Sequence, residues 1–281
     1  MQDQLEQSGS EGPDRPGLRA AGQAVPSRQD LAGIVPPDLS IVIPVHNESA
    51  NIAGLLAEIR DVLGEDANYE VIVVDDASDD GTPELLREIG QTMAALRTVR
   101  HASQRGQSAS VLSGVRAARA AWVATLDGDG QNDPADIPLL LAARDQEGAP
   151  ANLHMVAGHR ANRHDNWLRR ASSRIANAVR GWALRDAIPD SGCGLKLFSR
   201  AAFVALPHFD HYHRFLPALI KRNGGAVLSV AVSHRPRGGG HSHYGVFNRL
   251  WIGVIDLIGV MWLRRRSVYD ADGAHRSDEK E

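Results

Sequence analysis

This sequence contains a single cysteine and shows no marked excess of charge of either sign. Cys193 is the only cysteine in 281 residues, so an internal disulfide is excluded and a reducing compartment is expected. The formal net charge of −3 argues against a general nucleic-acid-binding protein, which usually carries an excess of basic residues. Because Cys193 has no identifiable partner base, we interpret it as a small packed residue.

Long hydrophobic runs are also scarce. Residues 1–30 contain no apolar segment, so no signal peptide is expected. The longest apolar run, Leu250 to Leu263, is interrupted by Asp256. As a helix it would extend about 21 Å, which is less than the roughly 30 Å of a bilayer's hydrocarbon core. We therefore expect no helix that spans a membrane.

The remaining composition is that of an ordinary globular protein, with 43% hydrophobic and 23% charged residues. The length allows one large α/β domain or two small ones. Residues 1–37 are rich in Gln, Gly, Ser and Pro and are expected to form a disordered arm. We expect an ordered domain at 38–245, a terminal helix at 246–266 and a polar tail at 267–281.

Short β-branched runs alternate with segments of helical periodicity from residue 39 onwards. This alternation predicts an α/β fold with a mostly parallel sheet flanked by helices. In such sheets, ligands bind beyond the carboxyl ends of the strands. Strands are predicted at 39–44, 70–74, 97–100, 122–126, 153–158 and 226–232, and helices at 51–63, 82–89, 108–120, 134–144, 167–184, 215–222 and 246–264.

Two aspartates, Asp127 and Asp129, directly follow the predicted strand at 122–126. Two carboxylates at this spacing can share one hard cation, and Mg²⁺ or Mn²⁺ suits such oxygen ligands while leaving positions for phosphate oxygens. The glycines at 128 and 130 allow the backbone to turn tightly. The alternative is a polar turn that simply ends the strand.

Adjacent carboxylates, Asp75 and Asp76, also end the second predicted strand. They repel each other unless a cation or hydrogen-bond donors face them, and a nucleoside offers N–H and O–H donors. Asp79 and Asp80 lie just before the helix at 82–89 and are interpreted as favourable acids at its N-terminus.

The first strand leads into Asn47 and Glu48. Asn47 is a candidate helix N-cap and Glu48 a candidate first-turn acid, or both belong to a ligand site. Each of the three polar segments is a weak signal alone. Their order, each directly after a strand, makes the combination specific.

Further segments extend this pattern along the chain. Taken in order, the set is Pro44 to Glu48, Val74 to Thr82, Asp127 to Gln131, Gly158 to Arg160, Ser173 to Asn177, Asp190 to Gly194, and Arg237 to Gly245. This set resembles family 2 glycosyltransferases with the GT-A fold. The later segments are similar to the dolichol- and polyprenyl-phosphate sugar transferases, which include the dolichol-phosphate mannosyltransferases. The resemblance covers roughly residues 38–245 and implies a GT-A nucleotide-diphospho-sugar transferase domain there.

The resemblance implies a donor site that binds a GDP- or UDP-linked sugar. Asp127 and Asp129 would be catalytic and would place Mg²⁺ or Mn²⁺ against the diphosphate. Arg105 lies in the basic, glycine-containing segment before the third helix, although a plain loop with Ser108 as helix N-cap is an equal alternative. The residues expected to hold the nucleotide-sugar are Pro44, Glu48, Asp75, Asp76, Arg105 and Gln131.

The resemblance also implies an acceptor site for a polyprenyl phosphate. Arginines can bind a phosphate with two hydrogen bonds, and Arg160 is expected to contribute to catalysis as well. His213 to Phe215 are expected near this groove, and His243 stands where relatives often have lysine. The candidate phosphate-binding residues are Arg160, Arg169, Arg170, Ser173, Arg237 and Ser242.

The expected reaction is metal-dependent and inverting, because an ionised lipid phosphate can attack the anomeric carbon in line. Trp251, Trp262 and Arg264 to Arg266 suit a terminal helix lying in a membrane interface, although a buried or dimer-forming helix is an equal alternative. We expect a peripheral protein on the cytoplasmic face of the membrane, with a homo-oligomer left open. Alternative functions are transfer to a non-lipid acceptor of the cell envelope and non-catalytic binding of a nucleotide-sugar.

Overall fold

The computed structural model describes residues 35–160, 181, 184, 188–235 and 246–266. The expected N-terminal arm lies almost wholly outside these residues. So do the polar tail and nearly all of the helix expected at 167–184.

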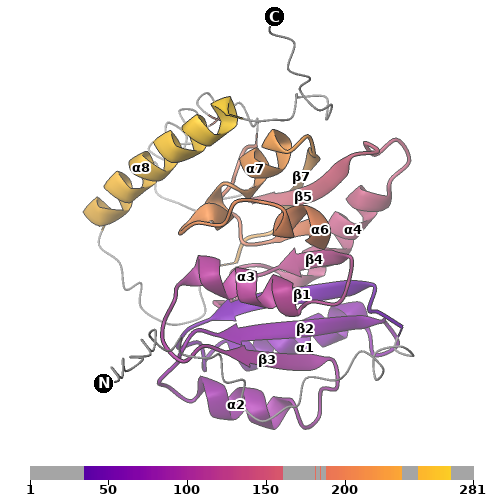
Figure 1. Ribbon diagram of the computed structural model, residues 1–281. Helices are drawn as coiled ribbons and strands as arrows, with labels where there is room; N and C mark the ends of the chain where they lie inside the picture. Colours follow the sequence, from indigo (N-terminus) through magenta and orange to yellow (C-terminus); the bar gives the residue numbers. More distant parts are fainter. Residues whose placement is uncertain (1–34, 161–180, 182–183, 185–187, 236–245, 267–281) are drawn as a thin grey trace, which may run out of the picture.

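A seven-stranded sheet forms the centre of the molecule (Figure 1). The order of the strands is β3-β2-β1-β4-β6-β5-β7, and β6 runs antiparallel to both of its neighbours while all other pairs are parallel. The expectation of a mostly parallel sheet is therefore confirmed. The strands are β1 (Leu39–Val45), β2 (Tyr69–Asp75), β3 (Leu96–Arg100), β4 (Trp122–Thr125), β5 (Leu153–Arg160), β6 (Lys196–Ser199) and β7 (Ala226–Val232).

The helices lie close to their predicted positions, with ends displaced by one to a few residues. The segment predicted as one helix at 134–144 begins as a 3₁₀ turn, and α6 was not predicted because its five residues give no helical period. The helical elements are α1 (Ile52–Leu63), α2 (Thr82–Ile89), α3 (Gln107–Ala117), η1 (Pro134–Asp136), α4 (Ile137–Asp145), α6 (Arg200–Val204), η2 (Tyr212–Arg214), α7 (Leu216–Arg222) and α8 (Val246–Arg265).

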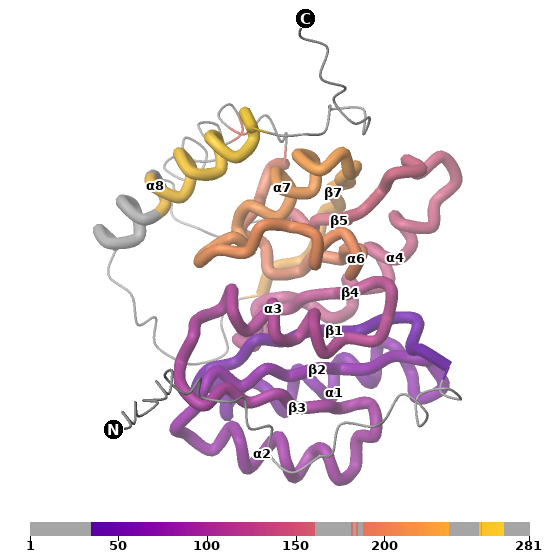
Figure 2. Tube along the Cα trace, in the orientation of Figure 1, coloured from indigo at the N-terminus to yellow at the C-terminus, as the bar shows by residue number. Residues whose placement is uncertain are grey.

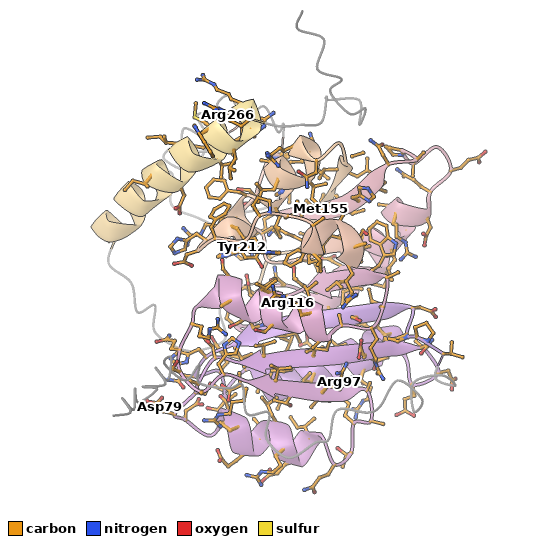
Figure 3. All side chains as sticks on the ribbon, in the orientation of Figure 1. Asp79, Arg97, Arg116, Met155, Tyr212 and Arg266 are labelled. Atoms are coloured by element: carbon orange, nitrogen blue, oxygen red, sulfur yellow. The ribbon has the colours of Figure 1, made fainter. Side chains whose placement is uncertain are left out.

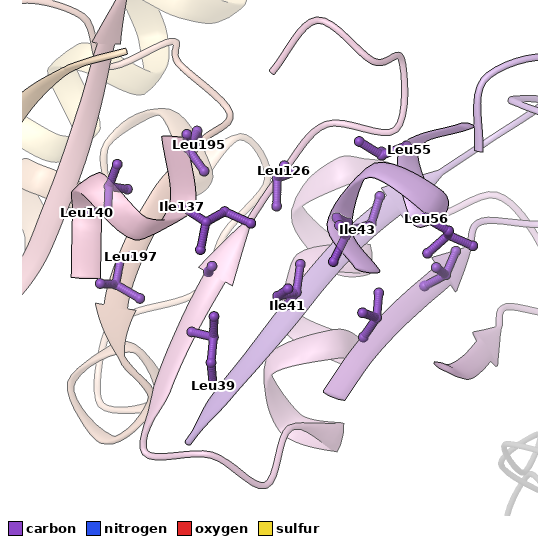
Figure 4. Close-up of a cluster of buried hydrophobic side chains, with 14 of the residues drawn as sticks. Leu39, Ile41, Ile43, Leu55, Leu56, Leu126, Ile137, Leu140, Leu195 and Leu197 are labelled. Atoms are coloured by element: carbon purple, nitrogen blue, oxygen red, sulfur yellow. The ribbon is translucent and has the colours of Figure 1, made fainter. Parts of the chain in front are cut away.

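The sheet has an apolar core on each face because side chains alternate along its strands. On β1, Ile41 and Ile43 belong to the core that includes residues of α1, α2 and α4 (Figure 4). Val42, between them, belongs to the opposite core with residues of α3, α6, α7 and α8. The protein is thus a three-layer sandwich, as the path of the chain in Figure 2 also shows.

The strand directions bring the expected site segments to one edge of the sheet. β1, β2, β4 and β5 all run the same way, so their carboxyl ends meet there, and the reversed β6 starts at that same edge. The chain first adds β2 and β3 on one side of β1, and then places β4 on the other side. Ligands bind at such a reversal of strand order in open α/β sheets.

α8 packs on the rest of the molecule through one side. Val260 is fully buried, the side chain of Arg222 donates a hydrogen bond to the carbonyl of Leu263, and His211 lies 3.2 Å from Asp256. Of the helices that the structure describes, none combines the length and apolar character needed to cross a membrane.

Candidate functional site

A cavity of ≈ 320 Å³ opens at the carboxyl edge of the sheet, where β1 and β4 lie side by side. Asp127 and the three cations Arg160, Lys196 and Arg214 line it, so opposite charges meet within one cavity. Among the residues that the structure describes, the lining is Pro44, Gln107, Val111, Thr125, Leu126, Asp127, Arg160, Asp190, Ser191, Gly192, Gly194, Lys196, His213, Arg214 and Leu216.

Asp127 is the carboxylate that the end of β4 places in this cavity. Its Oδ1 accepts a hydrogen bond of 2.8 Å from the side chain of Gln107. Burial raises the pKa of Asp127, and the charge of Asp129 raises it further, against the opposing charges of Lys196 and Arg160. A second cation would favour the charged form of Asp127, and the oxygen ligands of Asp127 and Asp129 have the chemistry that a divalent metal prefers, so the metal role of this pair stays a prediction.

The carboxylate of Asp127 rests against the backbone of Gly194. A Cβ atom at position 194 would lie 2.2 Å from Oδ2 of Asp127 and 2.6 Å from Oδ1 of Asn132. Only glycine therefore fits here without moving the carboxylate. The segment before β6 thus packs directly against the Asp127 carboxylate.

Asp129 is buried beside the cavity, and it stabilises the turn that follows β4. Its Oδ1 accepts a hydrogen bond from the backbone of Gln131, whose carbonyl in turn accepts one from the backbone of Arg235. Neither Asp129 nor Gln131 is among the described residues that line the cavity. A pocket-lining role for Gln131 stays a prediction.

Asp75 and Asp76 lie at the carboxyl end of β2, as predicted, but both are buried. Asp75 is 0% exposed, and its Oδ1 accepts a hydrogen bond of 2.9 Å from the backbone of Ser78, while Oδ2 lies 3.4 Å from the guanidinium of Arg100. A direct contact of Asp75 with a nucleoside requires this turn to open. Its role in binding stays a prediction.

The carboxylate of Asp76 binds the segment that contains Arg105. Its two oxygens accept hydrogen bonds from the backbone N–H groups of Arg105 (2.9 Å) and Gly106 (2.7 Å), and His101 lies 2.6 Å from Oδ1. The structure therefore brings two predicted site residues, Asp76 and Arg105, together. They meet through backbone contacts rather than through the side chain of Arg105.

The interpretation of Asn47 as a helix N-cap and Glu48 as a first-turn acid is wrong. α1 begins only at Ile52, with Asn51 at the N-cap. Asn47 adopts a left-handed conformation (φ 58°), and its side chain exchanges two hydrogen bonds with Asp79. Asparagine tolerates this conformation better than most residues do. Its two hydrogen bonds with Asp79 connect the loop after β1 to the loop after β2.

Asp80 stabilises the start of α2, as predicted. It accepts hydrogen bonds from the backbones of Thr82 (2.9 Å) and Ser49 (3.2 Å). Although partial burial opposes the shift, these hydrogen bonds from Thr82 and Ser49 lower the pKa of Asp80 to about 2.

Ser108 is not a helix N-cap, contrary to one of the two alternatives for its segment. The N-cap of α3 is Gly106, and Ser108 lies in the first turn of the helix. Its hydroxyl is 2.7 Å from Nδ1 of His213, a residue that lines the cavity. A helix start one or two residues earlier than expected accounts for the error.

Arg160 lies at the end of β5 and lines the cavity as predicted. Its guanidinium donates two hydrogen bonds to Asp190, of 2.6 and 2.9 Å. Burial alone would lower the pKa of Arg160, but the hydrogen bonds and charge of Asp190 raise it. Asp190 therefore fixes the direction of the guanidinium at the cavity wall.

Lys196 and Gln107 line the cavity although no role was predicted for either of them, and Arg214, which was expected near the acceptor groove, lines it as well. Lys196 is buried at the start of β6, its ammonium donates a hydrogen bond to the carbonyl of Cys193, and burial lowers its pKa. Cys193 itself is buried, as expected of a packed residue. A role for Lys196 could have been predicted from its position two residues after the segment 190–194, which is one of the segments that resemble family 2 glycosyltransferases.

Five predicted acceptor residues cannot be placed against this cavity. They lie outside the described residues and remain predictions, and the same holds for His243. The five are Arg169, Arg170, Ser173, Arg237 and Ser242.

This fold and site define a glycosyltransferase of the GT-A class, and the chain belongs to glycosyl transferase family 2. The model of that family matches residues 40–206, which include β1, β2, β4 and both carboxylate segments. The family predicted from the sequence is thereby confirmed.

Among curated proteins, two similar relatives act on lipid-linked phosphates by name. The chain is 33% identical over 236 residues to the dodecaprenyl-phosphate galacturonate synthase of Rhizobium johnstonii, covering 81% of this chain and 68% of that one. It is 32% identical over 225 residues to the undecaprenyl-phosphate 4-deoxy-4-formamido-L-arabinose transferase of Aeromonas hydrophila, covering 79% and 67%. The match thus spans about two thirds of each relative.

Solved structures of similar fold contain nucleotides and divalent metals. Glucosyl-3-phosphoglycerate synthase from Mycobacterium tuberculosis, in complex with Mn²⁺, uridine diphosphate and phosphoglyceric acid, has a TM-score of 0.60 at 19% identity, covering 83% of this chain and 79% of that one. A mannosyltransferase from Pyrobaculum calidifontis, in complex with GDP-Man and Mn²⁺, has a TM-score of 0.57 at 21% identity, covering 82% and 64%. At these identities the likeness shows the fold.

Proposed function

We propose that this protein transfers a sugar from a nucleoside-diphosphate sugar to a polyprenyl phosphate, with a divalent metal and with inversion at the anomeric carbon. The observation that carries the proposal is the cavity in which Asp127 faces three cations, Arg160, Lys196 and Arg214. A reaction between two phosphate-bearing substrates needs a cation site for each of them. The lipid acceptor is supported by the two relatives named above.

On the donor side, Asp127 and Asp129 would hold Mg²⁺ or Mn²⁺. Among the described residues no cluster of three metal-ligating side chains occurs, so phosphate oxygens and water would complete the coordination. When bound, the metal neutralises the charge that develops on the leaving diphosphate. Pro44, Glu48 and the Asp76 segment would lie on the nucleoside side, at the ends of β1 and β2.

On the acceptor side, the cations of the cavity would bind the lipid phosphate. Arg160 is held in place by Asp190, and Arg214 is exposed at the cavity. An oxygen of the ionised phosphate attacks the anomeric carbon, and the bond from that carbon to the diphosphate breaks, releasing the nucleoside diphosphate. The phosphate is already an anion at neutral pH, so the attack requires no general base.

Sugar transfer into lipid tests the proposal directly. Radiolabelled nucleotide-sugars with uridine or guanosine bases are incubated with undecaprenyl phosphate, detergent and Mg²⁺ or Mn²⁺, and organic-extractable label is counted. Asp127→Asn and Asp129→Asn are expected to lower transfer by at least about 100-fold, because the charge that places the metal is lost. Asp61→Asn is the matched control, since Asp61 is exposed on α1.

Each other outcome of this experiment has a distinct meaning. Nucleoside diphosphate released without lipid labelling would move the acceptor to a non-lipid molecule. Nucleotide binding that needs no metal, with no turnover of any donor, would contradict the transferase and favour a binding protein. A product with retained anomeric configuration would contradict the in-line attack.

We further propose that α8 lies on the membrane surface that supplies the acceptor. Its outward side exposes Ile255 (66%), Ile258 (60%) and Trp262 (58%), which recur at helical spacing. Arg264 and Arg265 end the helix, and Arg266 follows directly (Figure 3). The guanidinium of Arg266 lies 5.6 Å from the centroid of the Trp262 ring. Apolar side chains beside a tryptophan and several arginines suit an anionic lipid surface better than a second copy with the same charges.

Vesicle sedimentation tests this placement. The double variant Ile258→Ser, Trp262→Ser should lose most binding to phosphatidylglycerol vesicles and keep its transfer activity in detergent. Leu139→Ser is the control, because Leu139 is an exposed large hydrophobic residue (49%) on α4. A concentration-dependent dimer that the double variant abolishes, without any vesicle binding by the wild type, would assign the face to a second copy.

A further inference from the structure

Asp76 and Asp127 follow strands that are not neighbours in the sheet. β1 separates β2 from β4 in the sheet, so the two strand ends are about 10 Å apart at a spacing of 4.7–4.9 Å per strand. Ionised carboxylates only accept hydrogen bonds, so a link between these two side chains needs a donor from a third group.

The segment Arg105 to Gln107 spans this gap. At one end, the backbone N–H groups of Arg105 and Gly106 donate hydrogen bonds to the carboxylate of Asp76, of 2.9 and 2.7 Å. At the other end, the side chain of Gln107 donates a hydrogen bond of 2.8 Å to Oδ1 of Asp127. Gly106 between them has φ 84°, a conformation that lets the chain turn from one carboxylate to the other.

The Asp76 end of the segment is held by further contacts. His101, 3% exposed, lies 2.6 Å from Asp76 and 2.9 Å from the hydroxyl of Ser113 on α3. Asp76 is thus tied to α3 through its own contacts with the segment and through His101. Gln107 is the first residue of that helix, so its side chain leaves a fixed backbone.

We infer that Gln107 is a positioning residue for Asp127, and that Asp76 acts on the metal site through it. An amide is suited to this task, because it orients a carboxylate oxygen without neutralising its charge. A lysine at position 107 would supply a competing cation at the same oxygen. The inference rests on the proposed function, since it assumes that Asp127 holds the metal.

Binding of Mn²⁺ alone, measured from the electron paramagnetic resonance of the free ion, tests the inference without turnover. Gln107→Met keeps the length of the side chain but removes the donor, and it should weaken Mn²⁺ binding by about tenfold, the lower end of the range for contacts that support a ligand. Gln91→Met, at an exposed glutamine after α2, should leave it unchanged. The thermal unfolding temperature should be equal in all three proteins.

A double-mutant cycle tests the link to Asp76. Asp76→Asn should also weaken Mn²⁺ binding, and adding Gln107→Met to it should cause little further loss, because both changes break one chain of contacts. Gly106→Ala disturbs the same turn without altering either carboxylate, since its Cβ atom would meet nothing within 4 Å but would be strained at φ 84°. If Asp76→Asn does not fold, the Mn²⁺ affinity of Gly106→Ala tests the same link.

Three results would overturn the inference. Wild-type affinity in Gln107→Met would contradict the positioning role and leave the proposed function intact. If the losses of Mn²⁺ affinity caused by the two single substitutions multiply in the double variant, Asp76 acts on the metal site by another route. Absence of Mn²⁺ binding by the wild type, with or without UDP or GDP, would remove the metal site from the proposed function and this inference with it.

Discussion

His213 illustrates how a single side chain responds to its place in the cavity wall. Its Nδ1 is 2.7 Å from the hydroxyl of Ser108. Burial lowers the pKa of His213 to about 3, and the positive charges of Lys196 and Arg214 and the neighbouring His211 add to the effect. The imidazole is therefore neutral at the cavity wall throughout the physiological range.

This low pKa predicts a loss of stability in mild acid. In the unfolded chain the pKa of a histidine is about 6.5, so below that value the unfolded state binds a proton that the folded state excludes. The free energy of unfolding should fall by up to about 1.4 kcal/mol per pH unit from this residue between pH 6.5 and about 3. Urea denaturation at pH 7, 6 and 5 should show a smaller loss in His213→Gln. Parallel curves for the two proteins would contradict the assignment.

At the level of residues, the sequence predicted the anionic side of the site better than the cationic side. Asp127 and Asp76 directly follow β-branched strands, so their edge of the sheet could be predicted from local pattern alone. Lys196 and Asp190 reach the same edge only because β6 runs antiparallel, and a four-residue strand does not reveal its partner or its direction. The contact of Gln107 with Asp127 depends on the pairing of β1 with β4, which no local pattern contains.

At the level of elements, the contact of α3 with the sheet depends on a glycine. A Cβ atom at Gly114 would lie 2.4 Å from Cγ1 of Val42 on β1 and 3.1 Å from Cγ2 of Val74 on β2. The helix can therefore approach both strands closely. Because Gln107 and Ser108 begin the same helix, this close packing also sets the position of one wall of the cavity.

Two glycine-to-alanine variants in helices should have opposite effects on stability. Gly114→Ala should lower the free energy of unfolding by about 1–3 kcal/mol, because the added methyl group overpacks the contact with β1. Gly54→Ala, in the exposed middle of α1 where a Cβ atom meets nothing within 4 Å, should raise it by about 0.5–1 kcal/mol. Chemical denaturation of both variants measures the difference, and equal effects would refute this account of α3.

Element boundaries were predicted less well than element types. The strands were recognised because valine and isoleucine recur in them, and β7 was placed correctly at Ala226–Val232. The start of α1 was predicted to within one residue, whereas Asn47 and Glu48 were misread because they have the composition of a helix N-terminus. In the structure they belong to a link with the loop after β2, a long-range contact that overrides local preference.

At the level of the whole molecule, the amino-terminal and carboxyl-terminal ends of the strands have different roles. The amino-terminal edge contains a polar network centred on Glu70, which is 1% exposed and accepts hydrogen bonds from Ser40, Arg97 and Arg119. Burial alone would raise the pKa of Glu70, but these hydrogen bonds lower it. The network connects β1, β2 and β3 far from the cavity, so it supports the sheet without contacting the site.

Glu70→Gln should therefore separate stability from metal binding. The variant should lose about 2–3 kcal/mol of unfolding free energy at pH 7, because charged hydrogen bonds are replaced by weaker ones and one donor is left unpaired. The difference from the wild type should shrink below the ordinary glutamate pKa of about 4.5, where the stabilisation by the charged form is lost. Mn²⁺ affinity should be unchanged, and a parallel loss of affinity would contradict the separation.

The cavity is built from two halves of the chain that meet where β4 pairs with β6. Of its lining residues, Pro44, Gln107 and Asp127 precede the exposed turn at 146–148, whereas the lining cations that the structure describes, Arg160, Lys196 and Arg214, follow it. Under the proposed function, the residues of the donor side precede this turn and the cations of the acceptor side follow it. A chimaera joined in that turn to the second half of a relative should inherit its nucleotide preference from one parent and its acceptor from the other.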